Sequence, residues 1–212
     1  MLPTTKQDNF RFWRNWTLFN SLGLFIGYII SFIIGTFTVF KVFDLSKEEW
    51  GSPQEQTILY IVSGAIIGFC IGLTQWLLLS KRFKLSSFWV YSVAIGFIIS
   101  ELIIGYVLWK LDINRGEHTF IEGKPVTHAL ILTFTGLVIG LIQLPMLKRY
   151  FSEVAYWIIA SALAWGISIL LTAIMHQSDI AVLITFILGI LLYGAITGAT
   201  LMWILKPKEV KS

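Results

Sequence analysis

The chain has 212 residues, of which 56% are hydrophobic and only 13% are charged, and its mean hydropathy is +0.77. A soluble domain is typically about 25% charged, so this chain carries too little polar surface to face water on all sides. The composition therefore excludes an ordinary soluble globular domain and predicts a protein whose solvent is partly lipid.

Six uninterrupted apolar stretches follow one another along the chain, at residues 17–40, 57–80, 88–109, 126–147, 154–175 and 180–205. Each reaches the ~20 residues that a helix needs to cross a ~30 Å hydrocarbon core. Helices are expected rather than strands, because backbone polar groups in lipid must be satisfied within the segment and no stretch alternates apolar with polar residues. The predicted fold class is an all-α integral membrane protein with six transmembrane helices in a single membrane domain, residues 1–212.

Basic residues predict the orientation of these helices. With an even number of spans both termini lie on one side, and that side would hold eleven of the 16 Lys and Arg residues. Because positive residues stay cytoplasmic, we expect both termini inside, in a bacterial inner membrane or, if the source is cyanobacterial, a thylakoid membrane. The basic residues follow the ends of the spans, so the net charge of +4 is a topology signal and does not indicate nucleic-acid binding.

Tryptophans agree with this orientation. An aromatic belt is expected at each membrane interface. The tryptophans near the predicted inner ends are Trp16, Trp76, Trp89, Trp157 and Trp203, and those toward the outer ends are Trp50 and Trp109. Trp165 is the exception, since it lies at mid-membrane beside Gly166, and we expect it to be buried against other helices.

A motif of two glycines four residues apart, followed three residues later by glutamine or leucine, recurs on the second, fourth and sixth stretches. It occurs as Gly68, Gly72 and Gln75, as Gly136, Gly140 and Gln143, and as Gly194, Gly198 and Leu201. The odd-numbered stretches share a second phrase, in which Gly27 and Ser31 recur as Gly96 and Ser100. The repeating unit is therefore a two-helix hairpin, present at about residues 11–82, 83–150 and 151–208.

A unit with an even number of spans keeps its orientation, so the three hairpins are expected around an axis along the membrane normal. This arrangement predicts a quasi-threefold ring of six helices. The repeated glycines allow close helix packing. The alternative reading is that small residues line a narrow path along the ring axis.

The GxxxGxxQW phrase and the ending of the last helix, YGAITGA, resemble small polytopic membrane proteins of bacteria, cyanobacteria in particular. This resemblance covers most of the chain and implies no activity and no site residues. Three units of two helices also resemble the layout of mitochondrial carriers, but the repeated P-x-(D/E)-x-x-(K/R) signature of those carriers is missing.

Glu101 is the only Asp, Glu, Lys or Arg inside a predicted span, at ~20 Å from the inner end of its helix for a rise of ~1.5 Å per residue. A charge there costs at least ~2.5 kcal/mol on insertion scales. Two readings stay open: a proton or cation site, or a protonated carboxyl group that hydrogen-bonds neighbouring helices. Polar groups at a similar depth belong to Ser31, Ser100, Ser168 and Tyr193.

Two further sets of residues are candidate ligands. Gln75 and Gln143 lie one turn from the inner boundary, where they bridge helices or bind a polar head group. His128 and His176 lie at outer helix ends, where a neutral ring can bind a metal, a haem or a chlorophyll magnesium. Their spacing matches no metal motif, so we expect no metal and no cofactor.

The sequence contains no G-x-S-x-G, H-E-x-x-H or phosphate-binding loop, so an enzyme is not expected. We expect a protein that binds or transports a small solute, ion or lipid between its hairpins, with proton coupling through Glu101. The alternative is a non-catalytic subunit or assembly factor of a larger membrane complex or a homo-oligomer. In either reading the lipid bilayer is the first partner.

Overall fold

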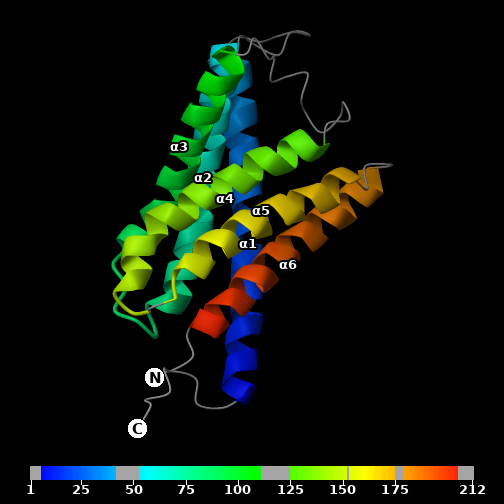
Figure 1. Ribbon diagram of the computed structural model, residues 1–212. Coiled ribbons are helices and arrows are strands. Elements are labelled where there is room, and N and C mark those ends of the chain that lie inside the picture. The colour runs from blue at the N-terminus through cyan, green and yellow to red at the C-terminus, as the bar shows by residue number, and fades with distance from the viewer. Residues whose placement is uncertain (1–5, 42–52, 111–124, 152, 175–178, 205–212) are drawn as a thin grey trace.

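The computed structural model describes residues 6–41, 53–110, 125–151, 153–174 and 179–204, and these residues form six helices (Figure 1). The helices are α1 (Lys6–Lys41), α2 (Pro53–Leu79), α3 (Phe88–Lys110), α4 (Pro125–Lys148), α5 (Ala155–Ile174) and α6 (Asp179–Ile204). Both α2 and α4 begin with proline, which suits the first helical position because its missing N–H would have no partner there.

Five of the helices are long and apolar enough to cross a membrane: α1, α2, α3, α4 and α6. The described apolar part of α5, Ala155–Leu171, is shorter than the other five. The prediction of an all-α fold is thus confirmed, and five of the six helices have the length and apolar composition that a membrane span requires. The largest difference in helix bounds is in α1, which begins at Lys6 instead of 17, because hydropathy marks where a helix enters lipid and not where it begins.

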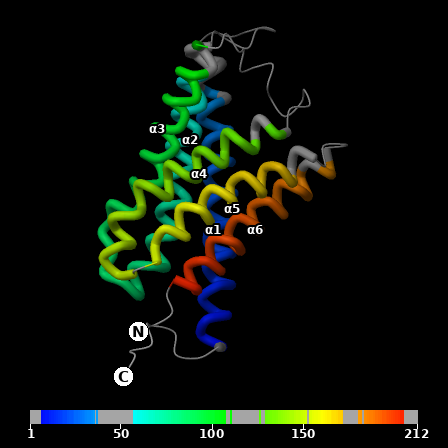
Figure 2. Tube along the Cα trace, viewed as in Figure 1, coloured from blue at the N-terminus to red at the C-terminus, as the bar shows by residue number. Residues whose placement is uncertain are grey.

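The helices close into a ring, because each packs against its neighbours in the chain and α1 also packs against α6. Figure 1 and the tube in Figure 2 show that α1, α2 and α3 run alongside one another, whereas α4, α5 and α6 are inclined to them. The two groups diverge toward the end of the bundle that lies away from both chain termini. The pairs α1–α6 and α3–α4 are therefore the two seams between the groups.

Glycines mark the closest helix contacts. A Cβ atom added at Gly72 would overlap the carbonyl oxygen of Val90 in α3, and one added at Gly140 would lie 2.8 Å from the Cα of Ile158 in α5. At Gly194 it would lie 2.9 Å from the Cα of Thr17 in α1. These approaches bring helix backbones together where a side chain would separate them. Gly35 differs, since an added Cβ would meet nothing within 4 Å.

Large side chains fill the interior of the ring. Near the termini, all six helices contribute to one buried cluster that contains Trp16, Trp89 and Trp157. A second cluster lies further along the helices and contains Phe97, Trp165 and Tyr193. Trp165 is buried as predicted. The alternative of an open path lined by small residues is wrong for this interior, because the glycines face neighbouring helix backbones instead.

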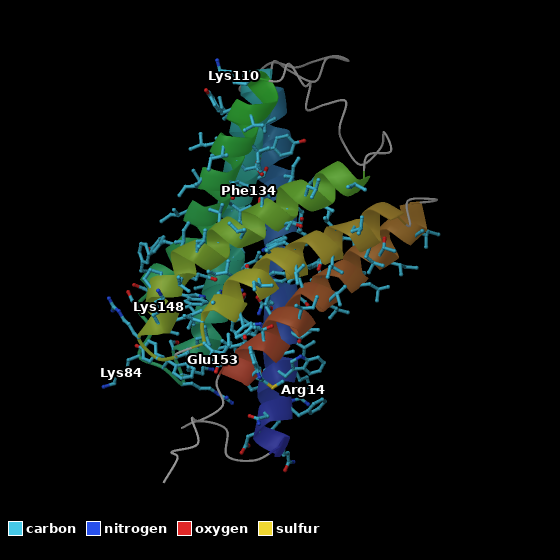
Figure 3. All side chains as sticks on the ribbon, viewed as in Figure 1. Arg14, Lys84, Lys110, Phe134, Lys148 and Glu153 are labelled. Carbon is cyan, nitrogen blue, oxygen red and sulfur yellow. The ribbon has the colours of Figure 1, made fainter. Side chains whose placement is uncertain are left out.

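Apart from Glu101 within α3, the described charged residues lie toward the two ends of the bundle. Figure 3 shows Arg14, Lys84, Lys148 and Glu153 toward the end that holds both termini, and Lys110 at the opposite end. The turns after α2 and α4 meet at the first of these ends, where the hydroxyl group of Tyr150 donates a 2.8 Å hydrogen bond to the carbonyl oxygen of Lys84.

Candidate functional site

The side chain of Gln75 joins four helices inside the ring. It is 1% exposed. Its Oε1 accepts a 3.1 Å hydrogen bond from the indole Nε1 of Trp89 in α3. Its Nε2 donates to Oδ1 of Asn20 in α1 at 2.8 Å and to the hydroxyl oxygen of Tyr193 in α6 at 3.4 Å. Every polar atom of this amide group therefore has a partner, as a buried polar group requires.

Gln143 in α4 hydrogen-bonds a tryptophan of the next helix, α5, as Gln75 does in α3, but it has fewer hydrogen-bond partners. Its Oε1 accepts a 2.8 Å hydrogen bond from Nε1 of Trp157, and the side chain is again 1% exposed. Its Nε2 is buried and has no hydrogen-bond partner in the described part of the chain. Each glutamine bonds the tryptophan that follows it by 14 residues.

A third tryptophan makes the corresponding bond at the seam between α1 and α6. Nε1 of Trp16 donates to Oγ1 of Thr197 at 3.0 Å, and that hydroxyl group donates to the carbonyl oxygen of Tyr193 at 2.8 Å. The alignment of Leu201 with the two glutamines is therefore wrong by about one helical turn. Gly194, which packs on Thr17, stands three residues before Thr197, just as Gly72 stands three before Gln75.

The three tryptophans pack together instead of facing lipid. The ring centroids of Trp16 and Trp157 are 6.2 Å apart, and those of Trp89 and Trp157 are 6.3 Å apart. All three side chains are fully buried, so the prediction that they belong to an interfacial aromatic belt is wrong. Each indole N–H needs an acceptor in this dry interior, and Gln75, Gln143 and Thr197 supply it.

A small crevice lies on the other side of the Gln75 layer, toward the diverging end of the helices. It has a volume of about 30 Å³, enough for roughly two water molecules at ~10–15 Å³ of probe volume each. Its walls come from α1, α4, α5 and α6, and they include Tyr28, Trp165, Ser168, Phe186 and Tyr193. Tyr193 thus belongs both to the crevice wall and to the hydrogen-bond layer below it.

Trp165 brings a donor to this wall. Its side chain is 4% exposed, and its ring centroid lies 4.7 Å from that of Tyr193. The buried indole N–H lies close to the Tyr193 hydroxyl group without making an aligned hydrogen bond to any described residue. The opposite corner of the crevice is aromatic, where Tyr28 and Phe186 meet edge to face at 4.8 Å.

Glu101 is buried at 6% exposure but does not line the crevice. Phe97 and Gly105, one turn before and one turn after it on α3, contact Gly64 and Thr57 of α2 respectively. Residues four apart lie on one helix face, so Glu101 faces α2 between these two contacts. The structure therefore does not bring Glu101 together with the two glutamines and Tyr193.

The predicted serines have separate surroundings. Ser31 is buried in α1, and Ser100 donates to the carbonyl oxygen of Gly96 within its own helix at 2.6 Å. Ser168 alone of the three lines the crevice. The side chains of His128 and His176 lie outside the described residues, so their ligand role stays a prediction. Among the described residues no group of His, Cys, Asp or Glu is arranged to hold a metal ion.

Arg82 lies in the turn after α2, at the terminus end of the ring. Its guanidinium carbon lies 4.2 Å from the ring centroid of Phe12 in α1. Burial lowers the pKa of Arg82 and the nearby carboxylate of Asp8 raises it. The guanidinium group of arginine stays charged in proteins, so the contact with Phe12 is a cation–π pair.

Sequence reasoning missed Asn20, Thr197 and the bonding role of the three buried tryptophans. The available signal was the shared spacing from Gln75 to Trp89 and from Gln143 to Trp157. No known protein family, curated protein or solved structure matches this chain.

Proposed function

We propose that all six helices cross the membrane as three hairpin units around one axis, with both termini in the cytoplasm. Three observations support this arrangement. The helices form a closed ring in chain order. Glycines of α2, α4 and α6 pack on α3, α5 and α1. A buried tryptophan of each odd-numbered helix donates to a polar side chain of an even-numbered one. The excess of basic residues at the terminus end supports a cytoplasmic location for that end, and the membrane that we propose is a bacterial inner membrane or, if the source is cyanobacterial, a thylakoid membrane.

Cysteine labelling in intact cells tests this topology. Single cysteines at Ser52 and at Gly123, in a background without Cys70, should react with a membrane-impermeant maleimide from outside. A cysteine at Ser86, in the turn after α2, should react only after the cells are opened. Labelling of Ser86 in intact cells together with silence at Ser52 would reverse the orientation.

The function that we infer is reversible binding of a small, largely apolar molecule in the crevice, without catalysis. The observation that carries it is a water-sized space, next to otherwise close-packed helices, whose wall holds the polar groups of Trp165, Ser168 and Tyr193. Binding sites in membrane bundles have this character: mostly apolar walls with a few polar groups that fix orientation.

Passage across the membrane is not needed for this function. The cluster around Trp16, Trp89 and Trp157 fills the ring below the crevice, so a solute would have to separate three packed indole rings to pass. Proton coupling through Glu101 would also require an effect of this residue on a crevice that it does not line, since Glu101 faces α2 instead. We therefore favour a binding protein over a transporter.

Photolabelling in native membranes tests this proposal. The probe is trifluoromethylphenyl diazirine, a small apolar reagent that dissolves in the bilayer. We expect peptides that contain Trp165 and Phe186 to be labelled in the crevice, and labelling to fall when Gly189→Leu fills it, since Gly189 is part of the lining. Gly35→Leu, which meets open space, is the matched control.

If Gly189→Leu folds and labels as strongly as the wild type, the crevice is not the binding site. The alternative role as a subunit of a larger membrane complex would then gain support. That role predicts co-purification of a fixed partner, whatever the state of the crevice.

A further inference from the structure

Two hydrogen-bond donors belong to residues of the crevice wall, and they favour some ligands over others. The indole N–H of Trp165 is a donor only. The hydroxyl oxygen of Tyr193 already accepts a hydrogen bond from Nε2 of Gln75, so its own proton remains available to donate. Both donors belong to neighbouring residues of the wall, so a group that accepts hydrogen bonds suits this space.

The charge and the size of the crevice restrict the ligand further. None of the residues that line it is charged, so an ion would lose its hydration without gaining a counter-charge. A volume of about 30 Å³ holds one small polar group and not a whole lipid-sized molecule. The remainder of a larger ligand would have to lie among the apolar faces of α1 and α6, where Phe25 and Leu183 are exposed to the bilayer.

We propose that the crevice binds the carbonyl group of a neutral lipid-soluble molecule, whose hydrocarbon part stays in the bilayer. A carbonyl oxygen has two lone pairs and accepts one hydrogen bond from each of Trp165 and Tyr193. Quinones, long-chain ketones and the acyl esters of membrane lipids all share this chemistry. The proposal rests on the inferred binding function and adds the chemical class of the ligand.

Paired probes test the ligand class. The full-length protein is placed in nanodiscs of ether-linked phospholipid, which contains no ester carbonyl group, and is titrated with a decyl-substituted benzoquinone or with decylbenzene. We expect the quinone to bind about tenfold more tightly than the hydrocarbon, as two neutral hydrogen bonds allow. A carbonyl stretching band shifted to lower wavenumber should appear only with bound quinone.

Two conservative variants assign the donors. Trp165→Phe and Tyr193→Phe each remove one donor and keep an aromatic ring, so each should lower quinone affinity several-fold and reduce the band shift. Decylbenzene affinity should stay the same in both, which also reports that the crevice still forms. Trp203→Phe, at an exposed ring at the terminus end of α6, is the matched control and should change neither.

The outcomes separate the two proposals. Equal binding of both probes, with no effect of either variant, would overturn the carbonyl class but leave a binding crevice. Binding of neither probe to the wild type would overturn both. Repeating the titration in ester-linked lipid separates the sources, because competition by the ester groups would weaken quinone binding if membrane lipids themselves occupy the site.

Discussion

Gln75 and Gln143 stand at matching positions 68 residues apart, and the structure gives them unequal surroundings. Both accept a hydrogen bond from a buried tryptophan of the next helix. Only Gln75 also donates, to Asn20 and Tyr193, whereas Nε2 of Gln143 finds no partner among the described residues. A repeated sequence thus reproduces the contact between one hairpin and the next, but not the further contacts that Gln75 makes with α1 of its own hairpin and with α6.

The physical source of this difference lies on the preceding odd-numbered helix. Asn20 stands four residues after Trp16, and its Oδ1 meets the amide group of Gln75. The residue four after Trp89 is Val93, which is fully buried and offers no acceptor to Gln143. A half-satisfied amide is a less stable arrangement than a fully bonded one, because the unpaired group lost its water on burial.

The largest effect is expected at the feature that both regions share, the glycine three residues before each glutamine. Gly72→Leu and Gly140→Leu should each lower the free energy of unfolding by more than about 3 kcal/mol, because the new side chain meets the backbone of α3 or α5. Unfolding in mixed micelles with increasing SDS measures the loss.

Gly35→Leu is the control for these two variants and should be nearly neutral, since nothing lies within 4 Å of the added Cβ position. Equal stability of all three variants would show that the glycines do not define close helix contacts. The two regions would then no longer share a glycine packing contact that stabilises the fold.

The two glutamines themselves should respond unequally to substitution. Gln75→Leu strands the indole N–H of Trp89 and the Oδ1 atom of Asn20, and we expect a loss of about 2–3 kcal/mol. Gln143→Leu strands only the N–H of Trp157 and removes an amide group that is itself unpaired, so about 1 kcal/mol or less is expected. The same SDS titration gives both values, and a larger loss for Gln143→Leu would reverse the comparison.

Val93→Asn should give Gln143 a hydrogen-bond acceptor like the one that Asn20 gives Gln75. The new side-chain oxygen would accept from Nε2 of Gln143 and raise stability by up to about 1 kcal/mol. In a Gln143→Leu background the same substitution should destabilise the protein, because the new amide group would be buried without a partner. A double-mutant cycle measures this coupling, and additive effects would mean that the two side chains do not meet.

The smallest effect is expected at Glu101, a buried polar group that belongs to neither region. Glu101→Gln keeps the shape and hydrogen-bonding capacity of the side chain, so stability should change by no more than about 0.5 kcal/mol. Diazirine labelling of the crevice should be unchanged. Loss of labelling in a folded Glu101→Gln protein would bring back the prediction of an ionisable functional group.

Much of the fold was predictable from the sequence. Hydropathy alone located six helices, and the bounds of α3 and α4 agree with the predicted stretches to within one residue at each end. Leu201 shows where this approach failed. The glycine pattern of α6 fits two alignments one turn apart, because Gly194 and Gly198 are themselves four residues apart, and only packing against Thr17 of α1 selects between them.

The candidate site was less predictable, for a related reason. Glu101 attracted attention because one ionisable side chain is conspicuous among apolar residues. Trp16, Asn20 and Thr197 are inconspicuous in the sequence, and their importance comes from contacts that span up to 181 positions along the chain. Hydropathy and local spacing carry no information about partners at that separation.

The seam between the first helix and the last has a consequence for how the protein is made. Synthesis on the ribosome delivers α1 to the membrane first and α6 last. Until α6 arrives, the indole N–H groups of Trp13 and Trp16 lack their acceptors at Ala195 and Thr197. These two donors of α1 therefore stay without their native acceptors until the last helix is made, so the hydrogen bonding of the first helix is completed only at the end of synthesis.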